Sequence, residues 1–179
     1  MVEELLFPEV KRISLFSSND IRGNFTKIFN DKYFQTLGLS CEFKECFISV
    51  SHKNVIRGLH FQAPPFDHIK LVSVLSGSVR DVVVDLRKGS PNYGKYVVVE
   101  LNSDLKQALY IPSGFAHGFL SLEDNTRMMY MVTEGYHPES DCGIRWDSIA
   151  YILGVKNPII SERDKGFVEL KDFESPFTI

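Results

Sequence analysis

The chain of 179 residues is long enough to bury a substantial core, and we expect one domain covering residues 1–179. Its composition of 44% hydrophobic and 24% charged residues is that of an ordinary globular protein, and its net charge of -3 argues against a nucleic-acid partner. No run approaches the about 18 apolar residues of a membrane span, and the acidic N-terminus MVEELLFPEV does not resemble a signal peptide. With an odd count of unpaired cysteines, this predicts a cytoplasmic protein with reduced thiols and no membrane partner.

Short β-type runs follow one another along the chain, separated by turn residues. The run CFISVSH alternates with period two, and KLVSVLSGSVRDVVVDLR predicts two strands joined near Ser76-Gly77-Ser78. Further strand runs are expected at residues 94–101, 107–112, 117–124 and 126–136. Helical signals are weak and limited to 31–38, ending at Gly38, and one turn within 161–167. Because long crossover helices are missing, we expect an all-β, antiparallel jelly-roll (cupin) barrel with short peripheral helices.

The run RGLHFQAPPFDHIKLV concentrates groups that bind anions or transfer protons. A lone histidine such as His60 in an apolar strand is usually a core residue. Here Arg57 and Lys70 lie nearby, and period-two alternation places Gly58, His60 and Gln62 on one strand face. In a jelly roll that face can line the inside of the barrel, where a ligand binds.

Later segments supply further candidates. His117 follows a tight Pro-Ser-Gly turn at the start of a strand, although such a histidine can be purely structural. Tyr130 and Tyr136 share one face if their strand is continuous, and aromatic residues at this spacing are often core residues. Asp164 reads by default as a surface helix cap.

Metal sites and other common catalytic motifs fit the sequence less well. Metal-binding cupins use a His-x-His pair, and Gln62 stands where the second histidine would be, which leaves His60, His68 and His117 as an alternative ligand set. His68 itself lies in the expected connection between two strands. The sequence has no C-x-x-C pair, no glycine-rich nucleotide loop and no nucleophile elbow.

Several segments together resemble the dTDP-4-dehydrorhamnose 3,5-epimerases, cupin-fold enzymes of deoxysugar biosynthesis. The matching blocks run in order from DIRGNF near residue 20 to SERD at 161–164, and between them lie RGLHFQ, KLV, VRDVVVDLRKGSPNYGKY, IPSGFAHGF, YMVTEGYHPE and IRWD. The resemblance implies an epimerase that acts on a nucleotide-linked 4-keto-6-deoxy sugar. It also implies a homodimer that works without a metal or an organic cofactor.

The resemblance implies catalytic roles residue by residue. His60 matches the general base, Tyr130 the proton donor on the opposite face, and Asp164 the carboxylate that pairs with the histidine. Lys70 matches the lysine beside the 4-keto oxygen, where a cation stabilises the enolate that forms when the adjacent carbon loses its proton.

Substrate-binding roles follow in the same way. Arg57 and His117 match residues that line the sugar and diphosphate pocket, and Gln62 and Tyr136 are expected to line it too. Arg22, in DIRGNF, matches an arginine that helps bind the nucleotide from the neighbouring subunit of a dimer.

The chain also departs from the family pattern. The strand before RGLH typically reads Gln-x-Asn-x-Ser-x-Ser, whereas Glu45, Phe47, Ser49 and Ser51 occupy these offsets here, and Lys27 replaces a usual glutamate. A carboxylate at Glu45 would accept hydrogen bonds from a guanine edge that thymine lacks. We therefore expect a GDP-linked hexose or heptose in preference to a dTDP-linked sugar, unless Glu45 faces solvent.

Several readings of the reaction stay open. Related enzymes invert C3, C5 or both, and His60 with Tyr130 is compatible with each outcome. A sugar 3,4-ketoisomerase of related fold also moves protons beside a ketone, but it uses a different histidine arrangement. A cupin module that binds a sugar nucleotide without catalysis is the non-enzymatic alternative.

Overall fold

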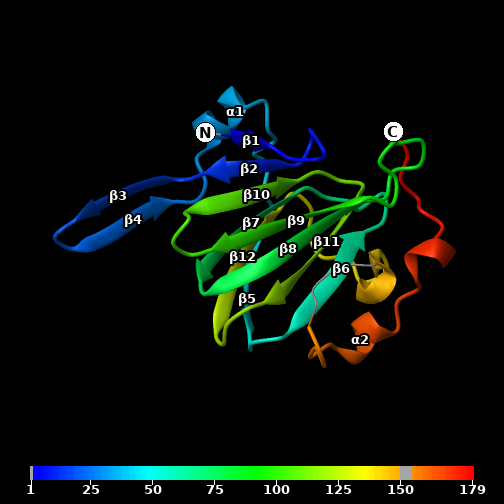
Figure 1. Ribbon diagram of the computed structural model, residues 1–179. Helices are drawn as coiled ribbons and strands as arrows, with labels where there is room; N and C mark the ends of the chain where they lie inside the picture. Colours follow the sequence, from blue (N-terminus) through cyan, green and yellow to red (C-terminus); the bar gives the residue numbers. More distant parts are fainter. Residues whose placement is uncertain (1, 150–154) are drawn as a thin grey trace.

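A computed structural model of the protein describes residues 2–149 and 155–179 (Figure 1). In this part of the chain, one antiparallel sheet has the strand order β1 (Val2–Glu4), β2 (Lys11–Ser14), β10 (Gln107–Ile111), β7 (Lys70–Ser76), β12 (Thr126–Val132) and β5 (Glu45–Ser51). A second antiparallel sheet has the order β13 (Asp141–Gly143), β6 (Ile56–Gln62), β11 (Phe115–Ser121), β8 (Ser78–Asp85) and β9 (Tyr96–Asn102). Strands β3 (Phe16–Asp20) and β4 (Gly23–Lys27) pair as a separate hairpin.

The two sheets face each other across the main core, as a jelly roll requires. Alternate side chains point inward, so Val72 and Met128 of the first sheet pack against Val83 and Phe119 of the second. The helices α1 (Asp31–Thr36) and α2 (Glu162–Lys165) and the 3-10 turns η1 (Trp146–Ser148) and η2 (Leu170–Asp172) are short and peripheral. The expected all-β, antiparallel cupin-type fold with short peripheral helices is therefore confirmed.

Smaller apolar clusters cover the outer faces of both sheets. Phe34 of α1 packs with Ile13 and Leu71 on the outside of the first sheet. Phe177, near the C-terminus, packs with Leu59 on the outside of the second sheet. Because the chain after β13 returns across β6 in this way, α2 lies beside the strand that carries His60 (Figure 1).

The junction predicted at Gly77 is present, but it joins the two sheets rather than two paired strands. Strand β7 belongs to the first sheet and β8 to the second. Gly77 has φ +79°, and a Cβ atom there would lie 2.5 Å from Thr126 Oγ1. The corner therefore needs both the positive φ and the missing side chain of glycine.

The expected helices are also present, with explicit caps. Helix α1 begins after Asn30, whose side chain accepts the Tyr33 N–H, and the left-handed Gly38 at φ +68° lies just beyond its end. Helix α2 begins after Ser161, whose side chain accepts the Asp164 N–H. Asp164 is thus a buried residue inside the helix, and its default reading as a surface cap is wrong.

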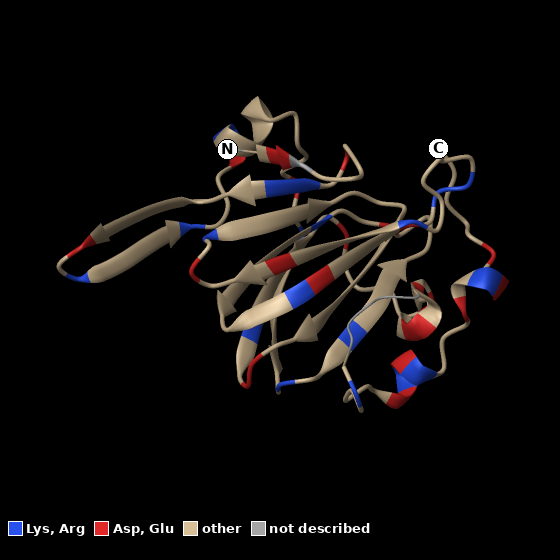
Figure 2. Cartoon of the chain, viewed as in Figure 1, with Lys and Arg blue, Asp and Glu red and all other residues tan. Residues whose placement is uncertain are grey.

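Charges of both signs are spread over the chain. Figure 2 shows acidic and basic residues interspersed on the strands and loops, including both signs at the tip of the β3–β4 hairpin. That tip carries the exposed ion pair between Arg22 and Asp20. Within the described residues, no helix has the length and apolar character needed to cross a membrane.

Candidate active site

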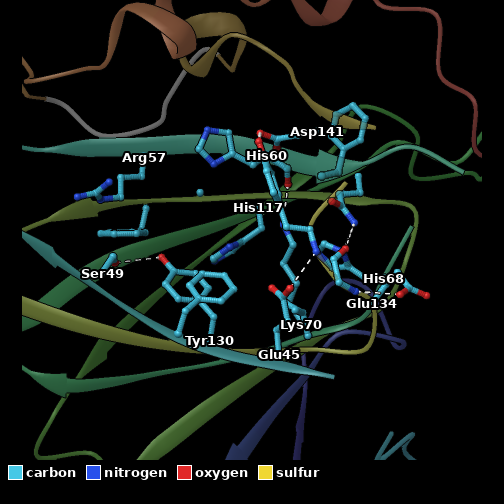
Figure 3. A pocket seen from close by; sticks show the side chains of 18 of the residues that line it. Glu45, Ser49, Arg57, His60, His68, Lys70, His117, Tyr130, Glu134 and Asp141 are labelled. Atoms are coloured by element: carbon cyan, nitrogen blue, oxygen red, sulfur yellow. Dashed lines mark hydrogen bonds between the residues drawn. The ribbon is translucent and has the colours of Figure 1, made fainter. Parts of the chain in front are cut away.

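A pocket of about 380 Å³ opens between the two sheets. Side chains from β5, β6, β7, β11 and β12 line it, and all the predicted site residues except Asp164 and Arg22 are among them. Figure 3 shows His60 on one wall and Tyr130 on the facing wall, with His117 and Lys70 between them. The alternation expected for β6 holds only in part: His60 and Gln62 line the pocket while Leu59 packs in the outer cluster, but Arg57 and Phe61 line the pocket too and Gly58 does not. The β11–β6 pairing is irregular along this stretch.

His60 forms a pair with the buried Asp164, which stands directly behind it. His60 Nε2 lies 2.9 Å from Asp164 Oδ1, and Asp164 Oδ2 accepts the Gly58 N–H at 3.1 Å. Burial alone would raise the pKa of Asp164, but the hydrogen bonds from His60 and Gly58 lower it, so the carboxylate stays ionised. Burial lowers the pKa of His60 and outweighs the opposing effect of Asp164. His60 is thus a neutral imidazole near pH 7, held by a carboxylate.

Arg163 is a site residue that sequence reasoning missed. Its Nη2 lies 2.8 Å from His60 Nε2, and its Nε lies 3.2 Å from Asp164 Oδ1. Asp141 accepts from the same guanidinium. Guanidinium nitrogens only donate, so His60 Nε2 accepts from Arg163 in one tautomer and donates to Asp164 in the other. The only sequence signal was adjacency to Asp164.

Lys70 extends from β7 into the pocket, where it is a cation near pH 7. Its Nζ donates to the His60 carbonyl oxygen at 2.9 Å. Burial lowers the pKa of Lys70 to about 8, although Asp141 and Asp81 act in the opposite direction. A lysine held in this way can stabilise negative charge that develops on a nearby substrate oxygen.

Tyr130 presents a protonated phenol on the wall opposite His60 (Figure 3). It is 8% exposed, and its Oη lies 3.5 Å from Ser49 Oγ. Burial is the main cause that raises the pKa of Tyr130, with a smaller contribution from Asp81. The phenol therefore keeps its proton over the physiological range and is available as a proton donor.

His117 belongs to a second buried histidine–carboxylate pair. Its Nε2 lies 2.8 Å from Oδ2 of Asp81, a fully buried residue of β8 that the sequence did not single out. His117 is the third residue of β11 rather than its start, and it stands opposite His60 across the β11–β6 pairing. Both histidines therefore reach the pocket, each with its own carboxylate behind it.

Arg57 and Gln62 sit on the same strand but differ in their freedom to meet a ligand. Arg57 lines the pocket, with its guanidinium held by Ser51 Oγ and the Val50 carbonyl, both at 3.1 Å. The Gln62 amide is bound to protein: its Nε2 donates to the carbonyls of Phe66 and Gly135, and its Oε1 accepts from His137 N. Gln62 thus ties two loops together at the edge of the pocket.

Glu45, Tyr136 and Arg22 complete the predicted residues. Glu45 lines the pocket, and its Oε1 accepts the Tyr136 N–H at 3.1 Å. Strand β12 ends at Val132, so Tyr136 lies in the following loop, and the idea that it continues one strand face with Tyr130 is wrong. Arg22, whose side chain is 85% exposed, lies on the β3–β4 hairpin, which projects from the body (Figure 1). A single chain does not bring Arg22 to the pocket.

The histidines considered as metal ligands have separate partners. His60 pairs with Asp164 and His117 with Asp81, while His68 Nδ1 lies 3.1 Å from Gln62 Nε2. His68 lies between β6 and β7 as expected, but it also lines the pocket, and burial lowers its pKa to about 3. No three His, Cys, Asp or Glu side chains in the described ranges are grouped so that they could hold a metal ion.

Comparison with known proteins identifies the family. The family profile described as dTDP-4-dehydrorhamnose 3,5-epimerase matches residues 4–172. An epimerase of that name from Escherichia coli is 50% identical over 129 residues, which cover 72% of this chain and 70% of the relative.

Solved structures agree with this sequence match. A Legionella pneumophila dTDP-6-deoxy-D-glucose-3,5-epimerase in complex with dTDP-4-keto-L-rhamnose has a TM-score of 0.93 and 35% identity, covering 100% of this chain and 98% of that one. A Bacillus anthracis dTDP-4-dehydrorhamnose 3,5-epimerase with TDP and PPi bound has a TM-score of 0.90 and 38% identity, covering 93% and 97%.

These findings correct one expectation about the substrate. The relatives carry dTDP in their names, and the two solved structures hold TDP or a dTDP-sugar, so the preference for a GDP-linked hexose or heptose is not supported. Glu45 lines the pocket, and one of its oxygens accepts the Tyr136 backbone N–H within the protein. The chain belongs to the dTDP-4-dehydrorhamnose 3,5-epimerase family and is an isomerase that epimerises nucleotide-linked sugars in deoxysugar biosynthesis.

Proposed function

We propose that the enzyme inverts C3 and C5 of a dTDP-linked 4-keto-6-deoxy sugar. The observation that carries the proposal is the placement of a neutral, carboxylate-backed His60 and a protonated Tyr130 on opposite walls of one pocket (Figure 3). Inversion of a carbon requires removal of its proton from one face and return of a proton from the other. The pocket offers a base and an acid in that arrangement.

The proposed reaction begins with removal of the proton from a carbon beside the ketone. His60 accepts this proton, and Asp164 stabilises the imidazolium that forms. The electrons move onto the 4-keto oxygen, where the Lys70 cation stabilises the enolate. Tyr130 then returns a proton to the opposite face of the carbon, which completes the inversion.

Binding of the nucleotide diphosphate is proposed to involve Arg57, because fixed guanidinium groups bind phosphate oxygens through charge-assisted hydrogen bonds. Arg22 is proposed to contribute from a second copy of the chain. This assignment is supported by its position on a hairpin that projects from the body of its own subunit (Figure 1). The homodimer and the cytoplasmic location inferred from the sequence remain part of this proposal.

Incubation with a dTDP-4-keto-6-deoxy sugar in deuterium oxide tests the reaction. NMR of the product should show deuterium at C3 and C5, with inverted configuration at both. Deuterium at one carbon only would contradict the double inversion. A shifted carbonyl would point instead to a ketoisomerase, and no change would point to a binding module without catalysis.

Titration with nucleotides tests the choice of base separately. Binding of dTDP should be tighter than binding of GDP when both are measured by calorimetry under the same conditions. Tighter binding of GDP would contradict the dTDP assignment while leaving the reaction type untouched.

A further inference from the structure

Phe47 covers one face of the Tyr130 ring. It lies on β5 directly opposite Tyr130 of β12 in the antiparallel register. The two ring centroids are 4.8 Å apart and the ring planes differ by 13°, so the rings are stacked. Phe47 also lines the pocket and is 48% exposed, whereas Tyr130 is 8% exposed. The phenylalanine therefore separates the tyrosine from the solvent on that side.

Tyr130 belongs to the main apolar core between the sheets, and two polar neighbours also contact its ring and hydroxyl. The His117 ring meets it edge-on, with centroids 6.3 Å apart and an interplanar angle of 69°. Ser49, two residues after Phe47 on the same face of β5, places its Oγ 3.5 Å from the phenol oxygen. Besides this core packing, one apolar stack, one edge contact and one long hydrogen bond position the tyrosine.

We propose that Phe47 is a positioning residue for Tyr130: its ring fixes the phenol between β5 and β11 and keeps water away from the hydroxyl. This inference rests on the proposed function, because it deepens the role assigned there to Tyr130.

The charged groups around Tyr130 also affect its pKa, and they must be told apart from the effect of removing the Phe47 ring. Asp81 on β8 raises the pKa of Tyr130 and Arg57 on β6 lowers it, but burial is the larger cause. His117 on β11 is paired with Asp81, and the β7 residue opposite Tyr130 is the apolar Val72. None of these groups is altered by a substitution at Phe47, so a lower pKa in the variant would report lost burial.

The test compares Phe47→Asn with a matched control on the same strand. Ile48→Asn makes the same kind of change one residue further along, at a side chain that is 56% exposed and points to the other face of β5. Phe47→Tyr preserves the stack and serves as the conservative rescue. Phe47→Leu keeps an apolar side chain without a stacked ring, so it separates the effect of an introduced amide from loss of the ring.

The direct readout is NMR of protein labelled with 13C-tyrosine, in which Tyr130→Phe assigns the resonance among the seven tyrosines. In the native protein the Tyr130 signal should stay constant up to about pH 10, where an ordinary tyrosine is half ionised. In Phe47→Asn the Tyr130 signal should titrate at lower pH than in the native protein, since burial is the main cause that raises the pKa of Tyr130. Ile48→Asn and Phe47→Tyr should titrate as the native protein does.

The second readout is the rate of deuterium incorporation from solvent into the sugar. Phe47→Asn should lower kcat by roughly tenfold, as expected for a misplaced acid, with a smaller change in KM. An unchanged Tyr130 titration in Phe47→Asn would overturn the inference, as would an equal effect of Ile48→Asn. If the titration shifts as expected but the native enzyme exchanges no sugar proton, the positioning role stands and the proposed function fails.

Discussion

His60 Nε2 lies 2.9 Å from Asp164 Oδ1, although the two residues are 104 positions apart in the sequence. The contact exists because the chain after β13 returns across the outer face of the second sheet and places the one-turn helix α2 beside β6. The capping of that helix by Ser161 and the Gly58 N–H fix the carboxylate. The peripheral C-terminal segment thus supplies a carboxylate to the proposed catalytic site and does more than cover the sheet.

Removal of either member of this pair should cost most of the activity. His60→Asn should abolish solvent-deuterium incorporation, and Asp164→Asn should lower kcat by roughly 10²–10⁴-fold, because a positioned general base contributes about that much. The measurement is the exchange rate followed by proton NMR. His52→Asn and Asp124→Asn, which alter an exposed pair on the surface, are matched controls and should leave the rate unchanged. Full exchange by His60→Asn would refute the base assignment.

Lys70 should set the alkaline limit of activity. Its pKa is lowered to about 8, so kcat/KM should fall as the pH rises through about 8 and the cation is lost. The same depressed pKa means that the folded protein disfavours the charged form, so Lys70 costs stability below its folded pKa, and this cost disappears as the pH rises above its ordinary pKa. A pH profile that stays flat up to the ordinary lysine pKa of about 10.4 would contradict the assignment.

Substitution of Lys70 by methionine separates its two effects. Lys70→Met should inactivate the enzyme yet raise the free energy of unfolding at pH 7 by about 1–2 kcal/mol, because a buried cation is replaced by an apolar chain of similar length. Urea denaturation monitored by fluorescence measures the change. Lys165→Met, at an exposed side chain on α2, should change neither activity nor stability appreciably. A less stable Lys70→Met protein would show that the hydrogen bond to the His60 carbonyl outweighs the burial.

The sequence could predict the strands of the barrel because alternation is strong where one face is buried. It missed β3, whose residues FSSND are all exposed and show no apolar face, and it missed the pairing of β1 and β2 with the edge of the first sheet. It placed Gly77 at a strand junction but could not tell that the strands part into different sheets there. That information lies in long-range pairing, which no local pattern encodes.

The site residues that the resemblance assigned could be predicted from the sequence. Residues that contact those side chains from behind were missed. In the sequence, Asp81 is one polar residue in a β-run. Its place in the site becomes visible only from its contact with His117 on the neighbouring strand. Arg163 looked like a surface charge next to Asp164. Gln62 lines the pocket as expected, but its amide also holds two loops, which sequence reasoning missed because the folding of those loops onto it is a tertiary event.

The corner between the sheets should be sensitive to the size of residue 77. Gly77→Ala combines a strained φ with a Cβ atom 2.5 Å from Thr126 Oγ1, so it should lower the free energy of unfolding by about 2–4 kcal/mol. Gly38→Ala has a similar positive φ but meets nothing within 4 Å, so it should cost only about 1 kcal/mol. Chemical denaturation of both variants isolates the packing contribution. Equal losses would show that backbone strain alone accounts for the glycine.

Arg163 should influence the acid limit of activity through His60. Burial is the main cause that lowers the pKa of His60, and the Arg163 guanidinium adds to it, so kcat/KM of the native enzyme should stay high below the ordinary histidine pKa of about 6.5 and fall at lower pH. Arg163→Met removes the cation, which should raise the pKa of His60 and move the acid limb to higher pH. Arg163→Lys keeps a positive charge and should leave the limb closer to that of the native enzyme. Loss of a merely structural contact would lower kcat/KM at every pH without shifting its acid limb. An unshifted acid limb in Arg163→Met would therefore refute this electrostatic role.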